Sequence, residues 1–94
     1  MEVDKISQLF YSLVYSFQMQ TWMSLGKIKS PVSDKLEKDL NAAQTTIDIL
    51  DMLMAKTKGN LNDDETRFIE HVVAELKLNF VEESKKEPEE PKTE

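Results

Sequence analysis

Residues 36–59, LEKDLNAAQTTIDILDMLMAKTKG, contain the pattern that decides the fold. Apolar side chains recur there at alternating spacings of four and three residues, which is typical of a helix that packs along other long helices. Gly59 follows the pattern and can adopt the left-handed conformation that ends a helix. We therefore predict a helix that begins after Asp34 and runs to about Thr57 or Lys58. Its apolar seam comprises Leu36, Leu40, Ala43, Ile47, Leu50 and Met54.

Capping signals predict where the second and third helices begin. Asp34 followed by Glu37 matches a capping box, in which the first side chain and the one three residues later cap the same helix end. Asn62 followed by Glu65 repeats this pattern directly after the turn at residues 59–62. A third helix should therefore extend from this turn to about Glu83.

Outside these two helices, the same rules predict a first helix and a tail. The first helix should run from about Lys5 to Leu25, with Asp4 as its N-cap and Gly26 just beyond its end. Helices of this length, joined by short connections, favour antiparallel neighbours. We predict an all-α fold of three long helices over residues 1–84, either an up-down-up antiparallel bundle or a helical hairpin with an N-terminal helix. Residues 85–94 lack large apolar side chains and should form a disordered acidic tail.

Composition excludes several classes of function. The 94 residues include no cysteine, so disulfides and thiolate metal sites are ruled out. A net charge of −6 opposes contact with a phosphate backbone, and we expect no nucleic-acid partner. A domain of about 80 residues buries only about 60–65% of its unfolded surface. Self-association, most simply as a two-fold dimer, would add to that burial.

The first helix is unusual because Ile6 to Gly26 include no charged side chain, although 32% of the chain is charged. A helix in a soluble protein normally turns one charged face to water, so this segment should be covered on more than one face. Only twelve of its 21 residues are apolar, which is too few for a membrane span. We expect a second molecule to cover the additional face.

Two apolar sides can be separated on this helix at 100° per residue. The side predicted to face the other two helices comprises Ile6, Leu9, Phe10, Leu13, Val14 and Phe17. The side predicted to contact an oligomer or partner comprises Tyr11, Tyr15, Met19, Trp22 and Met23. Ser12 and Ser16 lie one turn apart and are small enough for another helix to approach closely.

A second hypothesis uses the same aromatic and methionine side. Its five side chains could bind a small ligand or a lipid surface, with Trp22 and Ile28 placed at the membrane interface. The chain shows no pattern of charged start, apolar middle and small-residue cleavage site, so we expect a cytoplasmic protein without a secretory signal.

Candidate catalytic and metal-binding residues are few. His71 should lie on the outward side of the third helix, one turn from Glu75, without the converging partners that acid–base or metal chemistry requires. Asp48 and Asp51 fall outside the apolar arc of the second helix, as solvated carboxylates do. Lysine and glycine near residue 58 lack the spacing and the preceding strand of a phosphate loop. We expect no catalytic residue, metal or cofactor, and no enzyme activity.

The most distinctive motifs are DL at 39–40, AQTTIDILDML at 43–53, KTKGNL at 56–61 and, after Glu65, LKLNFV at 76–81. In these motifs the chain resembles a family of small helical bacterial proteins known only as a domain of unknown function. The first helix is similar more loosely, in Leu13, Ser16 and the Leu25-Gly26 ending. The resemblance covers roughly residues 6–82 and implies a helical cytoplasmic protein whose family has no established activity.

These observations favour a non-catalytic helical module that self-associates, with a dimer preferred, and that presents a surface to an unidentified protein partner. Binding of a small ligand or lipid surface is the alternative hypothesis.

Overall fold

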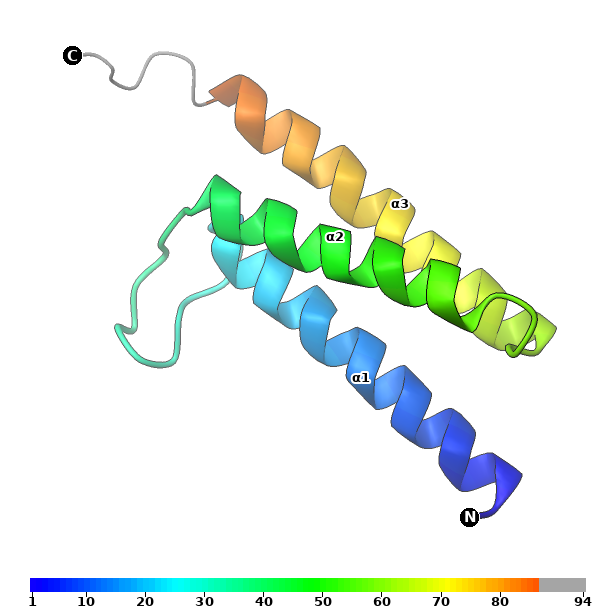
Figure 1. Cartoon of the computed structure of the whole chain (residues 1–94). Coiled ribbons are helices and arrows are strands. Elements are labelled where there is room, and N and C mark those ends of the chain that lie inside the picture. Colours follow the sequence, from blue (N-terminus) through cyan, green and yellow to red (C-terminus); the bar gives the residue numbers. More distant parts are fainter. Residues whose placement is uncertain (87–94) are drawn as a thin grey trace.

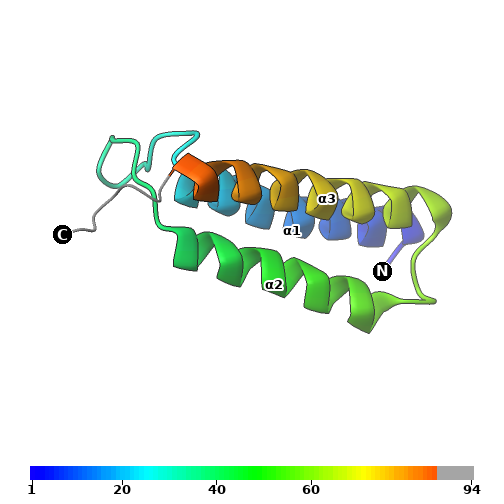
Figure 2. The same ribbon diagram turned by 90° about the horizontal axis from the view of Figure 1, so that it is seen from above.

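The computed structural model describes residues 1–86, in which three helices and no named strand are found. They are α1 (Val3–Ser24), α2 (Leu40–Thr57) and α3 (Asp63–Lys86). Successive helices run in opposite directions (Figure 1). Seen from above, α1 and α3 form one layer and α2 packs against both (Figure 2). The predicted all-α fold is confirmed in its up-down-up form.

The hydrophobic core lies where the three helices meet. α1 contributes Val14, α2 contributes Ile47 and Leu50, and α3 contributes the rest of the fully buried cluster. Each such side chain stabilises the fold by about 1.5–3 kcal/mol relative to exposure in water. The α3 members are Ile69, Val72, Val73 and Leu76. Half-buried side chains packed around them are Phe10, Phe17, Trp22, Leu53, Met54, Leu61, Phe68 and Phe80.

Gly26 ends α1 as predicted. Its φ of 79° lies in the left-handed region. Its N–H donates to the carbonyl of Met23 at 3.0 Å, and the N–H of Lys27 donates to the carbonyl of Trp22 at 2.9 Å. These two bonds form a Schellman motif, which satisfies carbonyls that the helix end would otherwise leave unpaired. At the other end α1 begins at Val3, with Glu2 rather than Asp4 at the N-cap position.

The predicted start of α2 was wrong by about a turn and a half. Asp39, not Asp34, caps the helix, and its Oδ1 accepts a hydrogen bond from the N–H of Ala42 at 3.0 Å. The residues before it pair with the end of α1 instead of forming a helix, because the N–H of Asp39 donates to the carbonyl of Ser24 at 2.7 Å. Leu36 therefore leaves the predicted seam and lies 60% exposed in the connecting loop.

The predicted capping box of α3 is confirmed. The Asn62 side chain accepts from the N–H of Glu65 at 2.7 Å, and the Glu65 carboxylate accepts from the N–H of Asn62 at 2.9 Å. The second Glu65 oxygen accepts from the hydroxyl of Ser7 at 2.6 Å, which ties the start of α3 to α1. The hydroxyl of Ser7 and the N–H of Asn62 together lower the pKa of Glu65.

The end of α3 differs from the prediction, since the helix continues to Lys86 rather than stopping near Glu83. Lys85 and Lys86, which were assigned to the tail, are thus helical. The other residues of the predicted tail, 87–94, lie outside the described residues.

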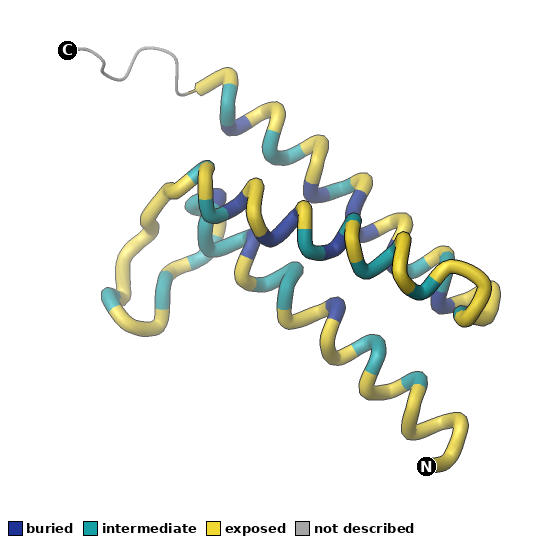
Figure 3. Tube along the Cα trace, in the orientation of Figure 1, coloured by how far each residue is buried: buried dark blue, intermediate teal, exposed yellow. Residues whose placement is uncertain are grey.

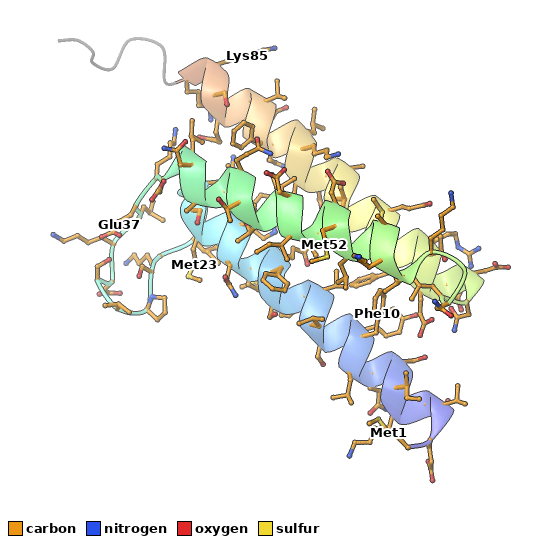
Figure 4. The ribbon with its side chains drawn as sticks, viewed as in Figure 1. Met1, Phe10, Met23, Glu37, Met52 and Lys85 are labelled. Atoms are coloured by element: carbon orange, nitrogen blue, oxygen red, sulfur yellow. The ribbon has the colours of Figure 1, made fainter. Side chains whose placement is uncertain are left out.

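A buried carboxylate holds the loop at residues 25–39 against α3. Lys27 and Lys38, at the two ends of this loop, donate to Glu83 at 2.8 Å each, and Lys86 donates at 3.1 Å. These lysines lower the pKa of Glu83 to about 2, since their hydrogen bonds favour the charged carboxylate. The loop, α1 and the end of α3 are therefore joined at one end of the bundle, where Figure 4 labels Glu37 and Lys85.

A hydroxyl pair joins α1 to α2. The Oγ atoms of Thr21 and Thr46 lie 2.6 Å apart, and both side chains are buried. One of the two hydroxyls donates to the other, and the second donates to a carbonyl of its own helix, either Thr21 to Phe17 at 2.8 Å or Thr46 to Ala43 at 3.0 Å. Because a buried hydroxyl is costly without a partner, this contact favours one alignment of the two helices.

Candidate functional site

Exposed apolar side chains gather along the N-terminal half of α1. Ile6 and Leu9 are each 50% exposed, and Leu13 is 44% exposed. We call these three residues the α1 stripe. Their spacings of three and four residues place them on adjacent turns of one helix face. Figure 3 shows that most of this half of α1 is exposed or only partly buried.

The stripe is exposed because α1 diverges from the other helices toward its N-terminus (Figure 1). Near its C-terminal end, Thr21 and Leu25 are completely or almost completely buried. Val14, near the middle of the helix, is the fully buried residue closest to its N-terminus, and Phe10 is half-buried on the side of α1 that faces the other two helices (Figure 4). One face of α1 is therefore covered within the chain, and the stripe lies beside that face.

The predicted division of the α1 faces was wrong for the stripe. Ile6, Leu9 and Leu13 were expected to face α2 and α3, but the centre of the inward face runs through Val14 and Thr21. The physical reason is the inward threonine, whose hydroxyl is satisfied by bonds to Thr46 and the helix backbone. When the inward face is located from apolar residues alone, Thr21 is left out. The predicted inward face then shifts around the helix toward Leu9 and Leu13.

The residues predicted to form an oligomer or partner interface do not share one exposed surface. Tyr11 packs edge-on against Phe68 of α3, with ring centroids 5.0 Å apart, and Trp22 packs against the core. Tyr15 is 55% exposed, whereas Met19 and Met23 are half-buried. Tyr11 and Trp22 are thus used inside the chain, whereas Tyr15 faces outward.

Small and uncharged polar residues continue the stripe toward the C-terminal end of α1. Ser12, Ser16 and Gln20 are all exposed. The hydroxyl of Ser16 donates to the carbonyl of Leu13 at 2.7 Å. Since this donor is already satisfied, covering Ser16 with an apolar partner would leave no unpaired hydroxyl hydrogen.

A cleft of about 470 Å³ lies between the end of α2 and the start of α3. Its volume is within the range of small-molecule sites. Carboxylates of Asp51 and Glu70 and the ammonium of Lys58 border apolar side chains there, so the cleft favours neither an anion nor a cation. It is also formed by α2 and α3 rather than by the five α1 residues predicted for a ligand or lipid site. The apolar side chains are Met54, Ala55, Leu61 and Ile69.

The residues examined for metal or acid–base chemistry are dispersed. His71 is exposed, Asp48 accepts a hydrogen bond from Gln44 at 2.9 Å, and Asp51 pairs with Lys77 at 3.0 Å. Within residues 1–86, no three histidine or acidic side chains converge as metal ligands do. Over the same range, no helix is both long and apolar enough to cross a membrane.

Comparison with models of protein families gives a match over most of the chain. The family model described as "Domain of unknown function (DUF1844)" matches residues 7–82, which include nearly all of α1, all of α2 and most of α3. Comparisons with curated proteins and with solved structures give no match.

Proposed function

We propose that this chain, which belongs to the DUF1844 family of unknown function, is a non-catalytic helical interaction module that self-associates as a two-fold dimer. The observation that supports this most directly is the α1 stripe: three large apolar side chains, about half exposed, inside a 21-residue segment without charge. Contiguous exposed apolar surface of this kind marks contact sites. A closed two-fold pair is the commonest way to cover it.

The energetics favour a dimer that exchanges with monomer. Burying the exposed half of each stripe residue contributes about 1 kcal/mol, and a two-fold pair buries six of them. Association costs at least about 4 kcal/mol, so the stripe alone gives only a weak dimer. The flanking residues Phe10, Phe17 and Met19, which are half-buried in the single chain, would add further burial. We expect a dissociation constant of about micromolar.

The positions of the titratable side chains support a non-catalytic role. Among the described residues, the carboxylates with lowered pKa, Glu65 and Glu83, are engaged in a helix cap and in lysine pairs. Both therefore serve the fold, and neither is paired with His71, which lies exposed elsewhere on α3.

Light scattering coupled to size exclusion tests the proposal. The double variant Leu9→Ser, Leu13→Ser should shift the protein to monomer while circular dichroism shows unchanged helicity, because these side chains lie outside the core. Leu78→Ser is the matched control, since Leu78 is 60% exposed on α3 and lies outside the stripe. Equal association of the double variant and the unmodified chain would refute a contact through α1.

A further inference from the structure

We infer that the partner of α1 in this dimer is α1 of the second copy, packed antiparallel and in a register that places Leu9 against Leu13. The inference rests on the proposed self-association and specifies its geometry.

The spacing of side chains beside the inward face of α1 supports a helix as the partner. The stripe and the exposed polar residues that follow it alternate at spacings of three and four, the period at which two long helices stay in contact. This run comprises Ile6, Leu9, Leu13, Ser16 and Gln20. It is distinct from the inward positions, such as Val14 and Thr21, so α1 can contact its own bundle and a second helix at once.

The identities along the run select one antiparallel register. With Leu9 of each copy against Leu13 of the other, the leucines form two adjacent central layers, and Ile6 meets Ser16 on either side. A shift by one heptad in one direction pairs Leu9 with Ile6 but places Leu13 against the charged Glu2. The opposite shift places the leucines against Ser16 and Gln20. Of these three registers, only the first pairs leucine with leucine and also keeps the stripe away from charged side chains.

In the two outer layers, the contact between Ile6 and Ser16 is favourable in both side-chain size and hydrogen bonding. The large side chain of Ile6 lies opposite the small side chain of Ser16. A small residue opposite a large one leaves room for close packing between two helices. The Ser16 hydroxyl already donates to Leu13 within its own helix. Burial beneath Ile6 of the second copy therefore leaves no polar hydrogen unsatisfied.

The charges of the chain favour an antiparallel pair of α1 helices over a parallel pair. Each copy carries a net charge of −6, so two copies avoid facing like charges most completely along the uncharged residues of α1. A parallel pair would bring Glu2, Asp4 and Lys5 of one copy against the same charges of the other. The antiparallel pair separates them and places Glu2 opposite Gln20, whose amide can donate to a carboxylate.

Disulfide trapping in the naturally cysteine-free chain tests this geometry. Ile6→Cys and Ser16→Cys are made separately, because both positions are exposed and each variant should still fold and associate. The two proteins are mixed in a glutathione redox buffer, and intact mass spectrometry identifies the covalent dimers. The prediction is a mixed disulfide between the two variants. Each variant alone should form little covalent dimer, since like positions lie about ten residues, or about 15 Å, apart along the helix.

The outcomes separate the inference from the proposed function. Covalent homodimers of each variant, without the mixed product, would show a parallel pair and overturn the inference. Dimeric mass by light scattering without any disulfide would place the contact elsewhere and also overturn it, with self-association intact. Monomeric mass for the unmodified chain would refute the proposed function itself. Leu78→Cys serves as the control for disulfides formed by random collision.

Discussion

Replacement of Glu83 by glutamine tests how one buried carboxylate holds the loop to α3. Glu83 is 4% exposed and accepts from Lys27 and Lys38 at 2.8 Å and from Lys86 at 3.1 Å. Glutamine has nearly the same shape but carries no charge, and its amide nitrogen cannot accept a lysine hydrogen bond. The variant therefore removes the charge interactions without leaving a cavity.

The expected loss of stability is moderate. A hydrogen bond to a charged group contributes about 1.5–3 kcal/mol. The three lysine side chains are between 27% and 63% exposed, however, so they regain water when the carboxylate is lost, and solvent screens the pairs. We expect Glu83→Gln to lower the free energy of unfolding by about 1–2 kcal/mol at neutral pH.

The pH dependence has a definite sign. The pKa of Glu83 is about 2 in the folded chain, below its ordinary value of 4.5, so the carboxylate favours the folded state wherever it is ionised in both states. The stability difference between the unmodified chain and Glu83→Gln should be constant above about pH 5. It should shrink as the pH falls from 4.5 through about 2, and vanish below that.

Urea unfolding followed by circular dichroism at several pH values measures this difference. The matched control is Glu82→Gln, which removes a neighbouring exposed carboxylate and should change stability little. Equal stability of the two variants at pH 7 would contradict this role of the Glu83 carboxylate, as would a loss in Glu83→Gln that persists unchanged at pH 2.

Three further predictions concern single side chains. Ile47→Ala should lower the free energy of unfolding by about 2–5 kcal/mol in urea titrations, because Ile47 is 1% exposed; a change below 1 kcal/mol would contradict its place in the core. Asn62→Ala should cost about 0.5–2 kcal/mol in the same titration through loss of the α3 cap, and an unchanged midpoint would count against that cap. His71→Ala should change the free energy of unfolding by less than about 0.5 kcal/mol and leave association, measured by light scattering, unaltered. Loss of a measurable activity in this variant would instead support an enzyme.

The helix ends could be predicted where one local signal had no competitor. Gly26, Gly59 and the pair Asn62 and Glu65 act through backbone conformation and short-range hydrogen bonds, and the structure places the turns there. The start of α2 was missed because the signal at Asp34 competes with pairing of the loop against α1. That competition depends on the folded arrangement and leaves no local trace in the sequence.

The exposed stripe on α1 was assigned to the wrong side because inward positions were judged by apolarity. Thr21 is completely buried through its contact with Thr46, 25 residues away, and no periodicity of α1 reveals that contact. The absence of charge between Ile6 and Gly26 was the useful signal, since it indicated surface to be covered without specifying which side. Two of the lysine partners of Glu83, Lys27 and Lys38, were missed because they come from a loop whose path the sequence did not predict.

Sedimentation equilibrium of the unmodified chain, from below to well above micromolar concentration, tests self-association through α1 most directly. We predict that the average mass rises from the 10.9 kDa of one chain toward twice that value, and that Leu9→Ser, Leu13→Ser abolishes the rise. A mass of 10.9 kDa over the whole range would contradict self-association. A rise that the double variant leaves unchanged would contradict the role of α1.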